Sequence, residues 1–512
     1  MKDRTLAALV SFAAGAMSLA AEVVWLRWIA FVELNTPQTL GLVLGVFLFG
    51  IVSGALLGRD LCARLPDPDE LKQRMGLLLL ASGLLDGLAP AALTWMGDPN
   101  LLPLAMYCFT YLTATVKATL FPIVHHLGSQ GAGQATGRSV ARVYFMNILG
   151  ATASPLLVSF WLLDHLGSDR VLQGVGLLAL ALATLVLART RTSGWHRAGT
   201  LLAAPAALGL VLVSPGDRVL RHLAFGADFT RLPLFIENRQ GIVHTTHNPT
   251  LGDGVFGGNV YDGRINLDPY RDSNGITRAY LLTVLHPHPR RALEIGLGSG
   301  SWARVLAAIP SLERLDIVEI NPAYLEVLRH YPAVRPLLAD PRVHIHIDDG
   351  RRWLRRYRGA PYDLILSNTT HHWRAYATNL LSVQFLEIVQ AHLAPDGIFA
   401  YNSTGSPDVL YTASRRFPFA FEWSPGYFVY AGRRDFRHPE PRAARRRLQA
   451  TLARLGLPAR GPAFERLAER LTHPRWIDAA TLEEAVGRPL ERVTDRNLLT
   501  EYRRSGRPAA FP

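Results

Sequence analysis

The hydrophobic positions divide the chain into two parts with different patterns. Up to about residue 215, apolar residues follow one another with few interruptions, and from about residue 231 short apolar runs alternate with polar turns. A helix needs about 20 mainly apolar residues to cross a bilayer. Stretches near this length lie at about 6–33, 37–58, 76–97, 101–124, 142–164, 170–188 and 198–215. Residues 1–215 are therefore predicted to form a polytopic α-helical membrane domain with six or seven helices.

Basic residues gather in alternate loops of this part. Lys2 and Arg4 precede the first stretch, and further Lys and Arg follow the second, fourth and sixth, whereas the other loops hold almost none apart from Arg170. Because loops rich in Lys and Arg stay in the cytoplasm, the N-terminus is predicted to be cytoplasmic. Seven spans would place the second part of the chain outside and six would keep it inside, and the pattern leaves both open.

Four charged residues lie within the apolar stretches: Glu22, Arg27, Asp86 and Lys117. Charges at that depth usually face the interior of a helix bundle or a cavity. They indicate either a polar pocket on a substrate path or structural pairing, and Arg27 is also close enough to the end of its stretch to snorkel.

The second part alternates strands and helices. Residues 216–275 are predicted to be a linker and a small β segment, and residues 276–432 an α/β Rossmann-like domain with a parallel sheet between helices. The strand runs are "RALEIGL", "RLDIVEI", "VHIHID", "YDLILSN" and "GIFAYNS", with a closing hairpin in "FEWSPGYFVYAG". Residues 433–512 are predicted to form an Arg-rich helical tail, whose basic face is either solvated or set against a membrane surface.

A glycine-rich turn follows the first of these strands. The pattern E-x-G-x-G-x-G comes from Glu294, Gly296, Gly298 and Gly300. Glycines allow a tight turn and let a ligand approach the backbone. A dinucleotide fingerprint would need a further glycine at Ser301, so the spacing fits better the turn that holds the methionine part of S-adenosylmethionine.

Acidic residues end the next two strands. Glu319 closes the second strand, where a carboxylate accepts hydrogen bonds from the hydroxyls of a ribose. Asp348, Asp349 and Gly350 end the third strand, where an adenine amino group would lie. With the glycine turn, these positions predict a nucleoside-binding site. The alternative is a Rossmann-like domain that has lost its ligand.

The chain resembles the spermidine synthases, or polyamine aminopropyltransferases, in the bacterial form fused to a membrane domain. The resemblance covers about residues 240–403 and includes "NRQGIVH", "YDGRINLD", "LEIGLGSG", "IVEINPAYLEVLRHY", "DPRVHIHIDDGRRWL" and "NLLSVQFLEIVQAHLAPDGIFAYN". "AEVVWLR" in the first apolar stretch and "VTDRNLLTEY" near the C-terminus are similar to segments of the fused forms. The resemblance implies a transferase of the S-adenosylmethionine-dependent methyltransferase and spermidine synthase fold, with its nucleoside ligand in contact with Gln240, Glu319, Asp349 and Gly350.

Three departures from that family bear on the chemistry. The family has an Asp at the position of Ser299 in the glycine turn, two Asp at the positions of Asn368 and His371, and a "YHE" segment that is missing around "YRDSNGITRAY". An amide does not accept a proton at neutral pH, whereas a histidine with a pKa near 6.5 does. The missing acids remove countercharges that a polyamine would need, which predicts a different acceptor.

The loop after the fourth strand, "NTTHHWRAY", supplies the replacement groups. His371 is the candidate base, with His372 next, and Asn368 and Thr369 would orient the acceptor by hydrogen bonds. An apolar or cation-binding wall would come from two aromatic side chains of the same loop, Trp373 and Tyr376. The alternative is that the histidines merely cap a surface loop.

Composition narrows the choice of partners. The formal net charge is +13, but Arg outnumbers Lys and no basic stripe is interleaved with aromatic residues, so no nucleic acid partner is predicted. The two cysteines, Cys62 and Cys108, have no spacing typical of a metal or redox site, and no metal is predicted.

These observations together predict a membrane-anchored transferase. It would use S-adenosylmethionine or its decarboxylated form as co-substrate and move a methyl or aminopropyl group to an amine or a membrane-associated acceptor. Its partners would be the lipid bilayer and a small-molecule or lipid-linked acceptor, and a homodimer stays open. The alternative from another class is a transporter or sensor whose soluble domain binds a nucleoside or polyamine without turnover.

The side of the membrane follows from the co-substrate. Adenosyl sulfonium compounds are made in the cytosol, so the soluble domain is predicted on the cytoplasmic side of the inner membrane. That requires an even number of spans, and the stretch 198–215, which is short and contains Pro205, is predicted to be interfacial or re-entrant.

Overall fold

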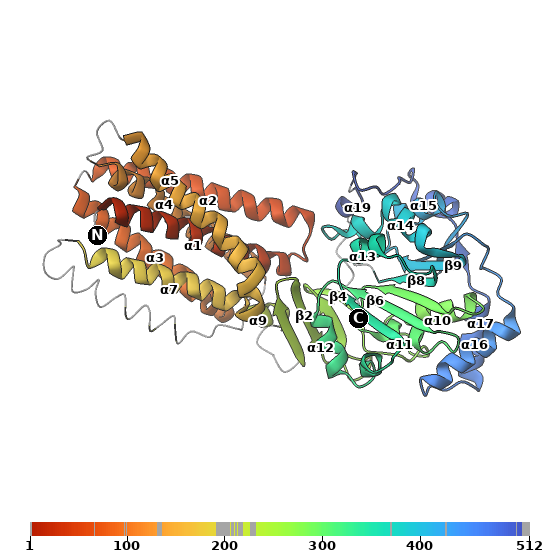
Figure 1. The fold of residues 1–512 in the computed structure, drawn as a ribbon. Helices are drawn as coiled ribbons and strands as arrows, with labels where there is room; N and C mark the ends of the chain where they lie inside the picture. The colour runs from red at the N-terminus through yellow and green to blue at the C-terminus, as the bar shows by residue number, and fades with distance from the viewer. Residues whose placement is uncertain are drawn as a thin grey trace. The chain divides into compact units, whose positions relative to one another are not determined.

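Long apolar helices build the first unit of the chain, which comprises Met1–Arg231 and Glu237–Arg239. The computed structural model describes residues 3–65, 67–96, 98, 100–130, 136–190, 205, 209, 212, 219–225, 232–368, 371–424, 427–497 and 499–503. The helices are α1 (Asp3–Val32), α2 (Pro37–Arg64), α3 (Pro68–Trp95), α4 (Leu102–Ser129), α5 (Thr136–Leu157), which continues through the π-helical Val158–Leu162 into α6 (Leu163–His165), α7 (Gly167–Leu187) and the short α9 (Val219–Phe225) (Figure 1).

Six of these helical segments are long and apolar enough to cross a membrane, counting α5 to α6 as one, within the residues that the structure describes. Their positions agree with the first six apolar stretches of the sequence. Most of the stretch 198–215 lies outside the described residues, so its predicted interfacial position stays a prediction.

Close packing between these helices depends on small residues. On the face of α2 that meets α4 they recur at every fourth position: Gly50, Gly54 and Gly58. A Cβ added at Gly54 would come within 2.2 Å of the carbonyl oxygen of Thr115. Between α1 and α5, Asn147 Nδ2 donates to the carbonyl oxygen of Ser11 at 3.0 Å. Close backbone approach and interhelical hydrogen bonds of this kind hold helices together where the surroundings are apolar.

Three of the four charged side chains that the sequence places inside the apolar stretches are paired: Arg27, Asp86 and Lys117. Lys117 Nζ on α4 lies 2.8 Å from Asp86 Oδ2 on α3, and the two side chains are 2% and 0% exposed. Arg27 Nε lies 2.7 Å from Glu237 Oε1. Glu22 is half-buried on α1. Of the two interpretations of the buried charges, structural pairing is the one that the geometry supports for Arg27, Asp86 and Lys117.

The second unit comprises Leu232–Ile236 and Gln240–Pro512 and contains two sheets. The smaller sheet has the order β1 (Leu234–Asn238), β2 (Gly241–Thr246), β3 (Gly254–Gly257) and β4 (Val260–Arg264), and β2, β3 and β4 are antiparallel neighbours. It is the small β segment that the sequence predicts.

The larger sheet has eight strands in the order β12-β10-β11-β9-β8-β5-β6-β7. The parallel strands are β5 (Arg291–Ile295), β6 (Arg314–Glu319), β7 (Val343–Ile347), β8 (Tyr362–Ser367) and β9 (Leu393–Asn402). β10 (Phe419–Trp423) and β11 (Phe428–Gly432) close the sheet as an antiparallel hairpin. The chain runs from β5 to β6 on one side and returns to β8 on the other, so the strand order reverses beside β5. In such sheets ligands bind at the carboxyl ends of the strands next to the reversal.

Helices cover both faces of this sheet (Figure 1). One apolar core lies between the sheet and α10 (Thr277–Leu285), α11 (Ser301–Ala307) and α12 (Ala323–His330), and the other between the sheet and α13 (Gly350–Arg356), α14 (Val383–His392) and α15 (Pro407–Ser414). The chain therefore consists of a helical region with six apolar helices and an α/β Rossmann-like domain, which confirms the predicted fold class.

The residues after 432 are part of the second unit. The helices α16 (Pro441–Arg454) and α17 (Pro462–Thr472) bury Leu448, Leu452, Phe464 and Leu471 in the core beside α10. β12 (Trp476–Ile477) pairs with β10, and α18 (Ala479–Val486) and α19 (Leu499–Tyr502) follow. The sequence prediction of a helical tail does not include this strand, and the finer domain boundaries stay predictions.

Candidate active site

The glycine turn joins β5 to α11 in a left-handed backbone conformation. The φ angles of Gly296, Gly298 and Gly300 are +85°, +51° and +74°. Residues other than glycine rarely adopt such values. A Cβ at Gly296 would lie 2.6 Å from the carbonyl oxygen of Asn368, and one at Gly298 would lie 2.6 Å from Asn368 Nδ2 and 2.7 Å from the carbonyl oxygen of Asp262. The turn is therefore packed against the end of β8 and against β4.

Glu319 lies at the end of β6, directly beside the glycine turn. Its Oε2 accepts the N–H of Leu297 at 2.8 Å and its Oε1 accepts the N–H of Asn321 at 2.9 Å. Burial raises the pKa of Glu319 to about 7, although these backbone hydrogen bonds act in the opposite direction. A carboxylate has further lone pairs, so Glu319 can still accept hydrogen bonds from a ligand.

Glu294 is fully buried in β5, and neither of its carboxyl oxygens has a hydrogen-bond partner among the described residues. Burial, and secondarily the charge of Glu319, raises the pKa of Glu294 well above its usual value. A buried carboxyl without a partner is unfavourable for folding. Groups of this kind concentrate at functional sites, and Glu294 lies in β5, the strand that leads directly into the glycine turn.

A third acidic side chain, Asp262 of β4, faces the same region and was not singled out from the sequence. Its Oδ2 accepts the hydroxyl of Tyr324 from α12, and burial raises the pKa of Asp262, whereas the charge of Arg374 lowers it. Arg374 interacts electrostatically with Asp262 and Tyr324. Burial lowers the pKa of the Arg374 guanidinium. Asp262, Glu294 and Glu319, named here the acidic cluster, thus interact electrostatically around the glycine turn, with Arg374 opposite Asp262.

The predicted adenine-side residues lie at the end of β7. Asp349 caps α13 by accepting the N–H of Arg352 at 2.7 Å, and Asp348 pairs with the Arg352 side chain. A Cβ at Gly350 would come within 2.3 Å of Ile295 Cγ2, so glycine is required for α13 to begin beside β5. Gln240 is exposed, and the next residue, Gly241, lies near Asn321, which follows Glu319 by two positions.

The loop after β8 carries the candidate base. The ring of His371 stacks on that of Trp373, with centroids 5.2 Å apart. Burial, with the nearby charges of Arg374 and His372, lowers the pKa of His371 to about 4. At neutral pH its imidazole is therefore uncharged and can accept a proton, although it is a weaker base than an ordinary histidine.

The other loop residues have different surroundings. His372 is buried, and its Nδ1 lies 3.0 Å from Thr404 Oγ1 while its Nε2 lies 3.4 Å from the carbonyl oxygen of Arg503. Trp373 is buried, whereas Tyr376 is 72% exposed with a φ of +69°. Thr369 lies outside the described residues. His372 is thus hydrogen-bonded to neighbouring segments, and His371 is the histidine that lies near Arg374, the basic residue opposite Asp262 of the acidic cluster.

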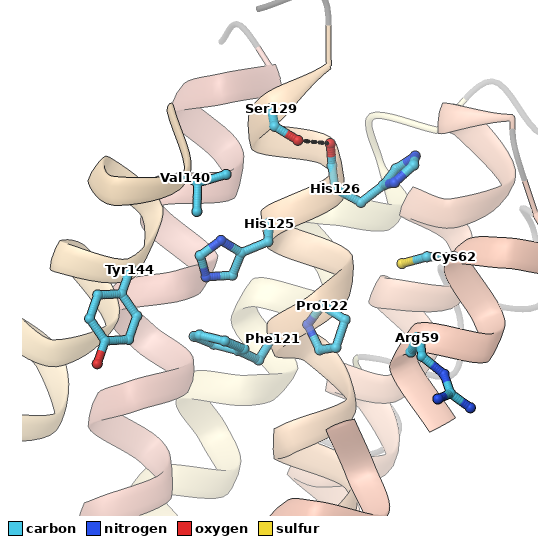
Figure 2. A pocket seen from close by; sticks show the side chains of 9 residues that line it. All are labelled: Arg59, Cys62, Phe121, Pro122, His125, His126, Ser129, Val140 and Tyr144. Atoms are coloured by element: carbon cyan, nitrogen blue, oxygen red, sulfur yellow. Dashed lines mark hydrogen bonds between the residues drawn. The ribbon is translucent and has the colours of Figure 1, made fainter. Parts of the chain in front are cut away.

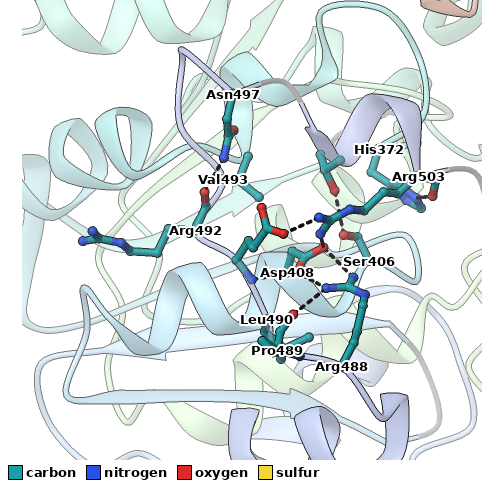
Figure 3. Close-up of polar contacts among 12 residues, drawn as sticks. His372, Ser406, Asp408, Arg488, Pro489, Leu490, Arg492, Val493, Asn497 and Arg503 are labelled. Atoms are coloured by element: carbon teal, nitrogen blue, oxygen red, sulfur yellow. Dashed lines mark hydrogen bonds and ion pairs between the residues drawn. The ribbon is translucent and has the colours of Figure 1, made fainter.

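A late segment of the chain, described at residues 488–497 and 499–503, contacts this loop where the carbonyl oxygen of Arg503 meets His372 and also contacts elements beside the loop, and we name it the C-terminal brace. Its Glu501 accepts the N–H of Thr378 at 3.0 Å, and its Asp495 pairs with Arg351 at 2.6 Å. Figure 3 shows Arg488 and Arg503 of the brace converging on the buried Asp408 of α15, at 2.8 Å and 2.9 Å. No sequence pattern predicts that this segment contacts the site. Its stretch "VTDRNLLTEY" only resembles a segment of the membrane-fused family members.

A separate hollow lies in the helical unit, between α2, α4 and α5 (Figure 2). Its volume is about 590 Å³, and it is lined by Arg59, Cys62, Phe121, Pro122, His125, His126, Ser129, Val140 and Tyr144. None of the residues predicted from the sequence to form the site lines this hollow.

Comparisons with known proteins address the sequence resemblance. Residues 279–411 match the family described as "Spermine/spermidine synthase domain". The chain is 27% identical over 326 residues to polyamine aminopropyltransferase 2 of Streptomyces coelicolor, which covers 60% of this chain and 56% of the relative. It is 28% identical over 346 residues to the polyamine aminopropyltransferase of Mycobacterium tuberculosis, covering 64% of each. The chain thus spans less than two thirds of the length of these curated relatives.

Solved structures give lower similarity. A spermidine synthase in complex with the transition-state analogue AdoDATO aligns with a TM-score of 0.38 at 19% identity, covering 47% of this chain and 88% of that structure. The spermidine synthase from Thermotoga maritima aligns with a TM-score of 0.40 at 17% identity, covering 50% and 88%. The match of residues 279–411 to this family confirms the resemblance predicted from the sequence, and in this chain the matched residues follow six apolar helices.

Proposed function

We propose that the second unit transfers a methyl or aminopropyl group from an adenosyl sulfonium co-substrate, S-adenosylmethionine or its decarboxylated form. The observation that carries this proposal is the acidic cluster around the glycine turn. Buried carboxyls usually have hydrogen-bonded or charged partners, and Glu294 has none among the described residues. A cationic ligand rich in hydroxyl groups would supply both kinds of partner.

Each part of the nucleoside has a candidate residue. Glu319 would accept hydrogen bonds from the ribose hydroxyls, as a carboxylate at the end of the second strand does in related folds. Asp349 and Gly350 would border the adenine, with Gln240 beside the ribose. Gly296 and Gly298 have positive φ angles and carry no side chain, which allows a tight turn beside Asn368 and Asp262, and the sulfonium substituents would lie against the backbone of this turn.

In the transfer step a nucleophilic nitrogen or oxygen of the acceptor attacks the carbon bound to sulfur. The carbon–sulfur bond breaks, its electron pair remains on sulfur, and a neutral thioether leaves. The acceptor loses one proton, which we assign to His371, while the side-chain amide of Asn368 holds the acceptor next to the glycine turn. Because sulfonium is a good leaving group, positioning contributes most of the rate and a weak base suffices.

The charge of the acceptor follows from the same loop. Asn368 and His371 stand where a polyamine site would have acids, and the buried Arg374 adds a positive charge. A doubly charged amine such as putrescine would be repelled there. The proposed acceptor is therefore a neutral or singly charged nucleophile, in line with a membrane-associated compound.

The second candidate function is a binding protein without turnover, a transporter or sensor. The observation that favours it is the low pKa of His371, about 4, together with the amide of Asn368. Neither group is a strong base at neutral pH.

The two functions are separated by binding and turnover measurements on the purified full-length protein. Calorimetric titration with S-adenosylmethionine, its decarboxylated form and methylthioadenosine tests the co-substrate, and mass spectrometry of a reaction with a lipid extract tests transfer. Binding with transfer to a lipid supports the transferase, binding without any transferred group supports the sensor, and no binding contradicts both.

The acceptor is tested with putrescine and decarboxylated S-adenosylmethionine. We expect little or no spermidine from the wild-type protein and more from the double variant Asn368→Asp/His371→Asp, which restores two acids. Efficient spermidine formation by the wild-type protein would show that the lost acids do not decide the acceptor.

We further propose that the first unit anchors the protein in the inner membrane with the second unit on the cytoplasmic side. The six apolar helices support the membrane anchor, and the Lys and Arg residues in alternate loops, which predict a cytoplasmic N-terminus, support the cytoplasmic side. Fusions of alkaline phosphatase and of green fluorescent protein after residues 192 and 230 test it. Fluorescence at both positions is expected, and phosphatase activity at 230 would overturn it.

A further inference from the structure

A second cluster of polar side chains, all able to bind a metal ion, lies at the end of the large sheet opposite to the glycine turn. His286 follows α10, Asp363 is the second residue of β8, and Asp396 lies near the start of β9. One potential ligand atom from each of the three lies within 4.8 Å of the others. The register of β5, β8 and β9 places this cluster at the amino ends of the strands, whereas the glycine turn follows their carboxyl ends.

His286 is the member of the cluster whose polar atoms lack partners among the described residues. Its side chain is 3% exposed, and neither ring nitrogen has a hydrogen-bond partner among the described residues. A buried imidazole normally donates from one nitrogen and accepts at the other. Nε2 points toward Asp396, but the distance to Oδ2 is 4.0 Å, too long for a hydrogen bond.

The carboxylates of Asp363 and Asp396 differ in how firmly their orientation is fixed. Asp363 Oδ2 accepts the N–H groups of Arg290 and Arg291 at 2.7 Å and 2.9 Å, which fixes the orientation of this carboxylate and leaves Oδ1 for another partner. The Asp396 side chain is 51% exposed and can rotate. Arg447 faces His286 but donates to the carbonyl oxygens of Thr283 and Val284.

We propose that His286, Asp363 and Asp396 bind a divalent transition-metal ion, with Zn²⁺ as the best fit. Zn²⁺ takes imidazole and carboxylate ligands at about 2.0–2.2 Å, which in a tetrahedral site places two ligand atoms roughly 3.3–3.6 Å apart. The 4.0 Å between His286 Nε2 and Asp396 Oδ2 exceeds this separation, and a rotation of the exposed Asp396 side chain would bring its carboxylate into range. Imidazole disfavours Mg²⁺ and Ca²⁺, which prefer oxygen ligands.

The surroundings have further features of metal sites. Burial lowers the pKa of His286, which keeps its imidazole neutral and able to coordinate. The backbone hydrogen bonds to Asp363 act as the outer contacts that orient a ligand. Solvent reaches the cluster on the side of Asp396, which provides a path of entry. The ion would connect the end of α10 to β8 and β9, so its role is structural and independent of the proposed transfer reaction.

The test uses the full-length protein after removal of metal with a chelator and of any affinity tag. Zn²⁺, Mn²⁺ and Mg²⁺ are titrated by calorimetry, and thermal unfolding is followed with and without each ion. We expect one Zn²⁺ per chain that is lost in the variants below. At a hundredfold excess over its Kd, Zn²⁺ should raise Tm by roughly 5–10 °C, because the ion binds the folded state alone.

Two variants and two controls make the result specific. His286→Gln and Asp396→Asn should each weaken Zn²⁺ binding 10-fold or more. Asp396 is exposed, so its variant keeps the fold even where His286→Gln does not. The controls His438→Gln and Asp435→Asn change an exposed histidine and an exposed aspartate outside the cluster and should bind like the wild type. X-ray absorption at the zinc edge should show one nitrogen and two oxygen ligands from protein. Equal Zn²⁺ binding and equal Tm shifts in the wild type and in Asp396→Asn would overturn the proposal.

Discussion

Two sets of buried charged groups, one in the helical unit and one around the glycine turn of the α/β unit, are compensated in different ways. In the helical unit Asp86 and Lys117 neutralise each other at 2.8 Å with almost no exposure. In the α/β unit Glu294 and Glu319 are just as deeply buried, yet no ion pair to either is present among the described residues, and the charge of Glu319 acts on Glu294. The paired charges stabilise helix packing, whereas the unpaired carboxyls store an unfavourable interaction that a ligand can relieve. This difference separates a structural polar contact from a binding site.

The largest expected effect comes from breaking the pair in the helical unit. Lys117→Met leaves the Asp86 carboxylate buried without its countercharge and should destabilise the protein by about 3–5 kcal/mol. Thermal unfolding in detergent measures this effect. The double variant Asp86→Asn/Lys117→Met should recover most of the loss, and Arg59→Met, which breaks an exposed pair, should change stability by less than about 1 kcal/mol. A single variant as stable as the wild type would contradict the structural role.

The matching change in the α/β unit should affect binding rather than folding. Glu319→Ala removes a charged hydrogen-bond acceptor and should weaken binding of S-adenosylmethionine or its decarboxylated form by 10-fold or more, equivalent to about 1.5–3 kcal/mol. Calorimetry gives the affinity. The control Glu326→Ala changes an exposed glutamate of α12. Unchanged affinity in Glu319→Ala would rule out the proposed ribose contact.

The pH dependence of binding sharpens the comparison further. The ligand needs an ionised Glu319, whose pKa is about 7 in the free protein. Roughly a tenth of the molecules are ionised at pH 6 and nine tenths at pH 8, so affinity should rise up to about tenfold over this range. The same titration with Glu319→Gln, which cannot ionise, should be flat. An equally steep profile in that variant would assign the pH dependence to another group.

The smallest expected effect is a gain in thermal stability when Glu294 is replaced by glutamine. The folded-state pKa of Glu294 is raised by burial, so the folded protein holds this proton more tightly than the unfolded chain. Stability from this group is complete below the unfolded pKa near 4.5 and is lost as pH rises. Glu294→Gln keeps the shape without the charge and should unfold at a higher temperature than the wild type at pH 8, with the difference shrinking toward pH 5. A constant difference across pH would mean that Glu294 has a partner in solution.

The elements of both units are predictable from the sequence because their signals are local. Twenty-residue apolar stretches and alternating short runs depend on neighbouring residues, and the glycine turn and Glu319 lie at fixed distances from β5 and β6. The site beyond these motifs depends on contacts between distant segments. Asp262 meets Tyr324 across 62 positions, and His286 meets Asp363 and Asp396 only after α10, β8 and β9 have assembled. No periodicity carries such information, so the acidic cluster was recognised in part and the His286 cluster was missed.

The C-terminal brace affects when the candidate site is completed while the chain is being synthesised. Glu501 binds the loop residue Thr378 from 123 positions later in the chain, so the ribosome exposes the loop well before its support. At about 5–20 residues per second, the loop waits roughly 6–25 s for the brace. During that interval the Rossmann-like core can already form, while Thr378 and His372 lack their contacts with the brace. If the proposed function holds, a partly synthesised chain would therefore have a folded core and an incomplete site.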